Sequence, residues 1–220
     1  MRVLDTLLYN WSQMDGVRTT VKKIMRSVAV VIDKVFSGKV GPNEITVISV
    51  WLHLIILALL LFGELKIAAV LIIIFGLMDS LDGELARLQN KVSDAGMVLD
   101  AVSDRMKEAF IYVGLAFYLA ENQQTLPVMI LVAALSGSML VSYVKAKGET
   151  VLAKNSGKTT TQINRTFQDG LMRYEVRTTI LAIGVFTSQL TISLSIIALL
   201  SWYTAFVRLQ TVLKQVNKRA

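Results

Sequence analysis

Six hydrophobic segments, each long enough or nearly long enough to cross a lipid bilayer, follow one another after residue 43. A membrane-spanning helix needs about 20 mainly apolar residues. With 54% hydrophobic residues and only two prolines, the composition is typical of one integral membrane domain. We therefore expect an all-α integral membrane protein with six transmembrane helices. The segments cover roughly 44–62, 65–82, 95–120, 126–146, 173–190 and 192–212.

An amphipathic helix is predicted ahead of the first span. Apolar residues recur at helical spacing between residues 17 and 36, and basic residues fill many of the other positions. Such a helix lies in the membrane interface with its apolar face towards the lipid. Pro42 and Asn43 are well placed to start the next helix. The predicted regions are an N-terminal segment at 1–43, the membrane domain at 44–213 and a basic tail at 214–220.

Basic residues indicate on which side of the membrane the loops lie. Seven Lys and Arg residues precede residue 44 and six lie between residues 145 and 173, whereas the 120–126 and 188–192 turns have none. Because cytoplasmic loops carry the excess of Lys and Arg, we expect a multi-pass protein of the cytoplasmic membrane with both termini in the cytoplasm. The net charge of +7 then fits anionic headgroups and substrates, and no nucleic-acid partner is expected.

The chain has no cysteine and one histidine, His53. Disulfides, thiolate nucleophiles and a histidine-rich metal site are therefore excluded. His53 lies inside an apolar run, and we interpret it as a packed helix residue. Any metal ion would be held mainly by oxygen ligands.

Four aspartates stand at helical spacing around the end of the second segment and the start of the third. Asp79 and Asp82 are three residues apart, and Asp100 and Asp104 are four apart, so each pair shares one helix face. Carboxylates at bilayer depth are costly without a counter-charge. Four that face one another would repel unless cations lie between them. All-oxygen ligation suits Mg²⁺, Mn²⁺ or Ca²⁺, and so dense a cluster could hold two ions.

Small residues and an arginine lie within the same stretch. Gly83, Ala86 and Gly96 allow a helix or a ligand to approach closely. Arg87 has the planar geometry that clamps a phosphate, and paired metal ions stabilise the oxygens of a phosphoryl displacement. Taken singly, each residue could be a cap, a packing contact or a membrane-boundary charge. The complete spacing favours phosphoryl transfer, and Asp94, which lies outside it, is expected in a loop or a cap.

The pattern D-x-x-D-G-x-x-A-R…G-x-x-x-D-x-x-x-D resembles the signature of the CDP-alcohol phosphotransferases, integral membrane enzymes of phospholipid synthesis. The likeness extends to the amphipathic helix, to Pro-Asn-x-x-Thr at 42–46 and to the six spans. Every signature position is filled, namely by Asp79, Asp82, Gly83, Ala86, Arg87, Gly96, Asp100 and Asp104.

The resemblance implies transfer of the phosphatidyl group of CDP-diacylglycerol to an alcohol, with release of CMP. Asp79, Asp82 and Asp100 would ligate two Mg²⁺ or Mn²⁺ ions. Asp104 would be the general base and would also contact the metal. A homodimer is implied as well. The nucleotide would be bound by Asp79, Gly83, Ala86, Arg87 and Gly96.

A second group of polar residues starts at the end of the fourth span and consists of Ser142, Lys145, Arg165, Arg173 and Arg177. Arg173 and Arg177 are four apart and are expected on one helical face. Their charges could converge on a phosphate-bearing acceptor, or Lys145 could simply mark the cytoplasmic end of a span. The Ser-x-x-Lys motif with a distant Arg resembles the acceptor pocket of phosphatidylinositol-phosphate synthases, which implies inositol phosphate as the acceptor. Gln162 and Asn164 stand where that pocket would offer a second Arg, so glycerol 3-phosphate or another alcohol is the alternative.

A cation-coupled transporter is the hypothesis from a different class, because it would also use aspartates within the membrane. Such transporters more often show repeated halves or broken helices. Here the candidate acids lie in one contiguous stretch, which favours the enzyme.

Overall fold

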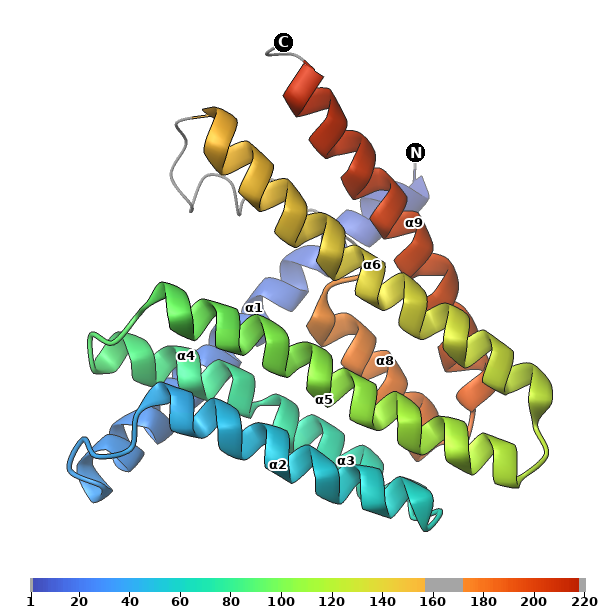
Figure 1. Ribbon diagram of the computed structural model, residues 1–220, viewed down its shortest axis with the longest axis horizontal. Coiled ribbons are helices and arrows are strands. Elements are labelled where there is room, and N and C mark those ends of the chain that lie inside the picture. Colours follow the sequence, from blue (N-terminus) through green and yellow to red (C-terminus); the bar gives the residue numbers. More distant parts are fainter. Residues whose placement is uncertain (1, 157–171, 218–220) are drawn as a thin grey trace. The chain divides into compact units, whose positions relative to one another are not determined.

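The computed structural model describes residues 2–156 and 172–217, and this part of the chain consists of helices and short connections without a strand. The all-α prediction is therefore confirmed for the described residues. The helices, shown in Figure 1, are α1 (Arg2–Val35), α2 (Pro42–Leu61), α3 (Leu65–Gly76), α4 (Met78–Leu88), α5 (Asp94–Glu121), α6 (Thr125–Ser156), α8 (Tyr174–Phe186) and α9 (Leu190–Asn217).

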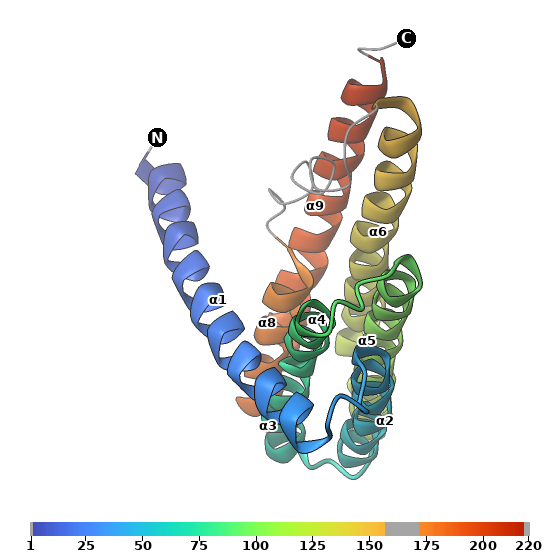
Figure 2. The ribbon, with the colours of Figure 1, turned by 90° about the vertical axis from the view of Figure 1, so that its left-hand side faces the viewer.

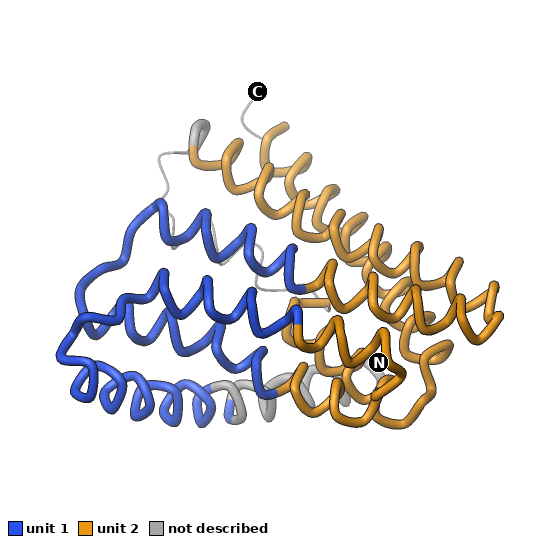
Figure 3. The backbone as a smooth tube through the Cα atoms, turned by 60° about the horizontal axis from the view of Figure 1, so that its bottom comes forward, with its two compact units in different colours: residues 1–54, 74–107 blue, residues 55–73, 108–220 orange. Residues whose placement is uncertain are grey.

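The chain divides into two compact units, which Figure 3 shows in different colours. The first unit comprises residues 1–54 and 74–107, and so contains α1, α4 and the first parts of α2 and α5. The second unit comprises residues 55–73 and 108–220, and so contains α6, α8, α9, most of α3 and the remaining parts of α2 and α5.

In the first unit, α1 packs against α4. Gln89, which directly follows α4, makes two hydrogen bonds that hold this end of α4. Its Nε2 donates to Asp33 Oδ1 on α1 at 2.7 Å and to the carbonyl oxygen of Val40, after α1, at 2.9 Å. The long helix α1 thereby holds the helix that carries the first two aspartates of the signature. The core there is formed by α1, α4 and the start of α2. It consists of Ala29, Ile45, Leu81 and Leu85, with Met25, Ile32, Val40 and Met78 packed around it.

The predicted packing role of His53 agrees with the structure. Its side chain is buried, its Nδ1 lies 2.7 Å from the carbonyl oxygen of Ser49, and its ring centroid lies 6.1 Å from that of Phe75. The start of α2 at Pro42 also matches the prediction.

The second hydrophobic segment forms two helices instead of the single one expected. The backbone N–H of Leu77 donates to Ile74 O at 3.2 Å, and that of Ser80 donates to Leu77 O at 3.0 Å. These bonds have the three-residue spacing of a 3₁₀ turn, which ends α3 at Gly76 and starts α4 at Met78. Helix α4 then continues to Leu88 and carries the signature as far as Arg87.

Three described helices are long and apolar enough to cross a membrane, namely Pro42–Leu61, Thr125–Ala153 and Leu190–Asn217. They correspond to the first, fourth and sixth predicted segments. Helix α3 has 12 residues and α8 has 13, which is short for a bilayer at about 1.5 Å per residue. The 28 residues of α5 are long enough but include several charges. The number of six spans therefore stays a prediction.

In the second unit, α6 and α9 run side by side, as Figures 1 and 2 both show. Their close approach depends on Gly137, where an added Cβ would lie 2.9 Å from Trp202 Cδ1 and 3.1 Å from Ser201 Cβ. Ala133 lies one turn before Gly137 on α6, and its carbonyl oxygen accepts a hydrogen bond from Trp202 Nε1 at 3.1 Å. Small residues at helix contacts in membrane proteins let the backbones approach in this way.

Replacing Gly137 with leucine should therefore lower the stability of the α6–α9 pair. Overpacking of this kind costs roughly 1–3 kcal/mol, and displacement of Trp202 would also break its bond to Ala133. The measurement is thermal unfolding of the protein in detergent. Gly16 is a matched control, because a Cβ there meets nothing within 4 Å. Equal melting temperatures for G137L and G16L would contradict the assignment.

Candidate active site

The aspartates of the signature lie on α4 and on the first part of α5, and two of them meet at a lysine. Lys107 Nζ forms an ion pair with Asp79 Oδ1 and a second with Asp104 Oδ1, the latter at 2.9 Å. The Lys107 side chain is completely buried, whereas Asp79 and Asp104 are 15% and 21% exposed. The structure thus brings together one aspartate from each predicted pair, with a positive charge between them.

Asp82 is buried next to this pair and is held by a residue from α2. The hydroxyl of Thr46 lies 2.6 Å from Asp82 Oδ2 and 3.1 Å from the carbonyl oxygen of Pro42. The carboxylate is the stronger and closer acceptor for the single hydroxyl proton. Asp79, Asp82 and Asp104 are close enough to interact electrostatically with one another and with Lys107. Three of the four predicted carboxylates therefore belong to one charged cluster.

Asp100 lies one turn before Asp104 on α5 and is half-buried. Within residues 2–156 and 172–217, no three His, Cys, Asp or Glu side chains are spaced as ligands of a single metal ion. The four-carboxylate metal site therefore stays a prediction, and in this arrangement the cation that joins Asp79 to Asp104 is the lysine ammonium.

Arg87 projects from the end of α4 with its side chain 57% exposed, and its guanidinium donates to Glu84 Oε1 at 2.6 Å. An added Cβ at Gly83 would lie 3.5 Å from the same guanidinium. Gly83 and Arg87 therefore share one surface of α4, with Ala86 half-buried beside them. The predicted nucleotide residues of α4 occupy neighbouring positions, as their spacing requires.

Gly96 lies in the first turn of α5, close to the start of α2. Its N–H donates to Ser93 Oγ at 3.1 Å, and an added Cβ would lie 3.2 Å from that oxygen and 3.5 Å from Asn43 Oδ1. Ser93 therefore caps the helix. Asp94, expected in a loop or a cap, is instead the first helical residue, where its charge suits the helix dipole.

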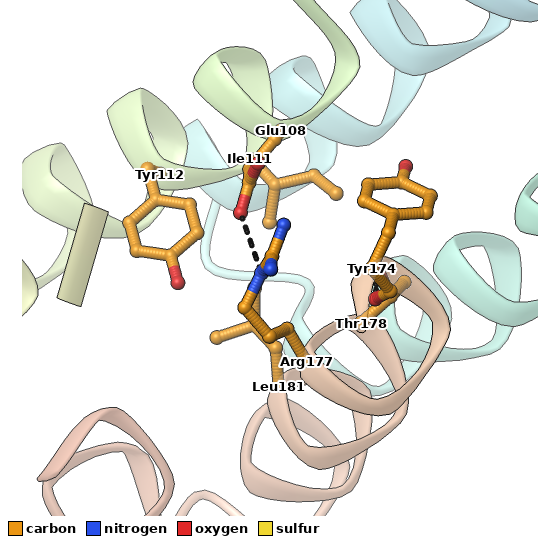
Figure 4. A pocket seen from close by; sticks show the side chains of 7 residues that line it. All are labelled: Glu108, Ile111, Tyr112, Tyr174, Arg177, Thr178 and Leu181. Carbon is orange, nitrogen blue, oxygen red and sulfur yellow. Dashed lines mark hydrogen bonds and ion pairs between the residues drawn. The ribbon is translucent and has the colours of Figure 1, made fainter. Parts of the chain in front are cut away.

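In the second unit, a buried polar cluster joins α5, α6 and α8. Glu108 Oε1 lies 3.5 Å from Arg177 Nε and accepts a hydrogen bond from the Ser138 hydroxyl. Arg177 Nη1 also donates to the carbonyl oxygen of Met172 at 2.8 Å. Figure 4 shows Glu108 and Arg177 facing each other in a small pocket that is also lined by Tyr112. Arg177 is thus buried and paired with an acid.

The predicted acceptor residues differ in their surroundings. Ser142 donates to the carbonyl oxygen of Ser138 at 3.3 Å, and Lys145 is half-exposed and lies 3.7 Å from Glu149. Arg173 precedes α8 with an extended backbone, so the expectation that it shares a helical face with Arg177 is wrong. Arg165 lies outside the described residues.

The buried charged residues that sequence reasoning missed include Lys107, Glu108 and Arg208. Arg208 lies on α9 and donates to the carbonyl oxygen of Val141 at 3.4 Å. The signal that could have found them is a charged residue inside an otherwise apolar helix, since such residues need partners.

The chain belongs to the CDP-alcohol phosphatidyltransferase family, because the family model matches residues 39–212. The membership and the three apolar helices identify an integral membrane protein. The expected resemblance is therefore confirmed.

Relatives named for inositol lipids are among the matches. The phosphatidylinositol phosphate synthase of Corynebacterium glutamicum is 33% identical over 114 residues, which cover 50% of this chain and 52% of that protein. The archaetidylinositol phosphate synthase of Aeropyrum pernix is 32% identical over 149 residues, which cover 65% and 68%. The crystal structure of Mycobacterium tuberculosis phosphatidylinositol phosphate synthase with CDP-DAG bound is similar, with a TM-score of 0.73, 25% identity, and coverage of 86% of this chain and 94% of that one. The chain thus spans about half the length of the first of these relatives.

Replacing Glu108 with alanine should strongly destabilise the second unit. Removing one partner of a buried ion pair costs about 3–5 kcal/mol, and here the Ser138 hydroxyl also loses its acceptor. Denaturant unfolding in detergent measures the effect. Glu121, the exposed last residue of α5, is the control, and E121A should change the free energy of unfolding little. Comparable losses in both variants would show that the Glu108–Arg177 pair is not the cause.

Proposed function

We propose that this chain transfers the phosphatidyl group of CDP-diacylglycerol to the hydroxyl of a polar alcohol, with inositol phosphate as the favoured acceptor, and releases CMP. The observation that carries the proposal is the complete signature from Asp79 to Asp104, inside the stretch that matches the family. Relatives named as phosphatidylinositol and archaetidylinositol phosphate synthases support inositol phosphate. Glycerol 3-phosphate is the alternative acceptor.

The aspartates of the first unit suit a hard divalent cation, and Mg²⁺ or Mn²⁺, as two ions, is proposed. Asp79, Asp82 and Asp104 offer only carboxylate oxygens, which these ions prefer. Asp79 Oδ2 is buried and has no hydrogen-bond partner among the described residues, as expected for an oxygen that receives a further cation. Bound ions would supply electrostatic stabilisation of the transferring phosphate and the leaving CMP oxygen. Asp100 is assigned as a further ligand from its signature position.

The protein side chains have separate tasks in this proposal. Asp104 accepts the proton of the acceptor hydroxyl on a carboxylate oxygen. Thr46 orients Asp82 through its hydroxyl. Arg87 binds a phosphate of the nucleotide, which requires its guanidinium, on a side chain that is 57% exposed, to leave the buried Glu84. Gly83, Ala86 and Gly96 are assigned to the nucleotide because small side chains there leave space for it, and a Cβ at Gly83 would reach van der Waals contact with the Arg87 guanidinium, at 3.5 Å.

Ser142, Lys145, Arg165, Arg173 and Arg177 are assigned to the acceptor and its phosphate. Lys145 is half-exposed and can therefore meet a soluble phosphate directly. Arg177 is buried and paired with Glu108, so we assign it an electrostatic contribution to acceptor binding and no direct contact with the acceptor.

The proposed topology has six spans, with α3 and α4 together forming the second and both termini in the cytoplasm. The proposal places the later part of α1 in the interface, since Ile24, Val31 and Val35 are 53%, 59% and 69% exposed and Lys22 and Lys23 are exposed too. Assembly as a homodimer is also proposed.

The purified protein should release CMP from CDP-diacylglycerol in the presence of Mg²⁺ or Mn²⁺, and a chelator should abolish the release. Among inositol 1-phosphate, glycerol 3-phosphate, serine and inositol, we expect inositol 1-phosphate to give the highest rate. Chromatography of the nucleotide and the lipid product measures the reaction. A higher rate with glycerol 3-phosphate would overturn the acceptor assignment alone. Absence of CMP with every acceptor would overturn the enzyme and favour the transporter.

Asp104→Asn should lower turnover by about 10²–10⁴-fold, because an amide cannot accept the proton and general-base catalysis contributes that much. Binding of CDP-diacylglycerol, measured separately by titration, should be largely kept. Asp94→Asn is the matched control, since Asp94 is exposed in the same helix and lies outside the signature. Substantial turnover by D104N would defeat the assignment of Asp104 as the base.

A further inference from the structure

Lys107 is a buried charge to which the family signature assigns no task. Its side chain is 0% exposed, and its ammonium pairs with Asp79 on α4 and with Asp104 one turn earlier on α5. Both carboxylates belong to the metal-binding set proposed above. The lysine therefore occupies the oxygens that a divalent cation would also need.

The physical reason for the lysine lies in the repulsion among the acids. Asp79, Asp82 and Asp104 act on one another electrostatically inside a largely buried cluster. Buried carboxylates of this kind are strongly destabilising without a cation. The single positive charge of Lys107, shared between two of them, offsets part of that cost when no metal is bound.

The same charge opposes a divalent cation. An ammonium and a metal ion held by the same two carboxylates would lie a few ångströms apart, where like charges repel strongly in a medium of low dielectric constant. The lysine has a flexible four-carbon stem, so its ammonium can move away while the carboxylates stay on their helices. The two cations are therefore alternatives at these oxygens.

We propose that Lys107 is a resident counter-cation of the aspartate cluster, which holds Asp79 and Asp104 together in the metal-free protein and is displaced from them when a divalent cation binds. This inference rests on the proposed metal role of the aspartates. It makes Lys107 a positioning residue that weakens metal binding and stabilises the metal-free state.

The test is Mn²⁺ binding to the full-length protein in detergent, followed by electron paramagnetic resonance of the free ion, together with melting temperatures in chelator and in Mn²⁺. Lys107→Met should bind Mn²⁺ roughly tenfold more tightly, because a hydrogen bond to a charged group contributes about 1.5–3 kcal/mol and tenfold in affinity corresponds to about 1.4 kcal/mol. Its melting temperature in chelator should fall, and the rise on adding Mn²⁺ should exceed that of the unchanged protein.

Two further variants test whether the positive charge of Lys107 is the cause of the change in Mn²⁺ affinity. Lys107→Arg keeps the charge and should bind Mn²⁺ no more tightly than the unchanged protein. Lys91→Met removes an exposed lysine from the same unit and should leave both Mn²⁺ affinity and melting temperature unchanged.

The outcomes separate the two proposals. If the unchanged protein binds no Mn²⁺, the metal role of the aspartates is overturned. The proposed exchange of the Lys107 ammonium for a divalent cation is then overturned as well. If the unchanged protein binds Mn²⁺ and K107M binds it equally or more weakly, only the exchange is overturned. A K107M protein that folds with Mn²⁺ and unfolds in chelator supports the exchange directly. If both K107M and K107Q fail to fold even with Mn²⁺, the exchange is contradicted, because the metal should replace the missing ammonium.

Discussion

The first unit depends on the ion pairs of Lys107 with Asp79 and Asp104, because these pairs offset the negative charge of the aspartates. Helices α4 and α5 present acids to each other, and these acids would drive the helices apart if no cation lay between them. The remaining contacts of the unit take effect once this repulsion is offset. Gln89 ties α4 to the end of α1, and Thr46 on α2 holds Asp82. The apolar core around Leu81 and Leu85 is small, so charge balance and packing both contribute to the position of α4.

The second unit also needs a partner of opposite sign for a buried charge, but here the unpaired charge would be positive. Here a buried cation, Arg177, is matched by an acid, Glu108, and the hydroxyl of Ser138 and the carbonyl of Met172 complete the cluster. Lys107 and Glu108 are consecutive residues of α5, and each supplies the charge that its own unit lacks. An apolar helix can carry so many ionisable residues because each of these two has a partner of opposite sign.

Much of the fold was predictable, because hydrophobic length and helix-start residues are local signals. The segments expected at 44–62 and 95–120 lie within two residues of the ends of α2 and α5, and Pro42 starts α2 as expected. The break at Leu77 was not predictable in the same way. The apolar run continues through it, and a change from four-residue to three-residue hydrogen bonds leaves no mark in the hydrophobic pattern. The fifth segment, expected at 173–190, begins within one residue of α8, although α8 already ends at Phe186.

The site was predictable as far as helix faces are concerned, since residues three and four apart share a face. The pairing of Lys107 with Asp79 on α4 was not predictable, because Asp79 lies 28 residues earlier and helical spacing relates only residues that are close in the sequence. Within α5, the three-residue spacing of Asp104 and Lys107 is also that of an ordinary surface ion pair. Burial distinguishes the two cases, and burial depends on contacts between residues that are far apart in the sequence.

A resident ammonium at these carboxylates also bears on which cations the cluster accepts. A monovalent ion that replaced Lys107 would bring the same charge and would lose the directed ion pairs to Asp79 and Asp104, so the exchange would be unfavourable. A divalent ion raises the positive charge beside three carboxylates by one unit, and the strong attraction at low dielectric offsets the loss of those pairs. Lys107 would therefore discriminate against monovalent cations by charge, while the all-oxygen donors select hard ions by chemistry. Charge and donor type together would restrict the cluster to hard divalent ions such as Mg²⁺, Mn²⁺ or Ca²⁺, although neither property does so alone.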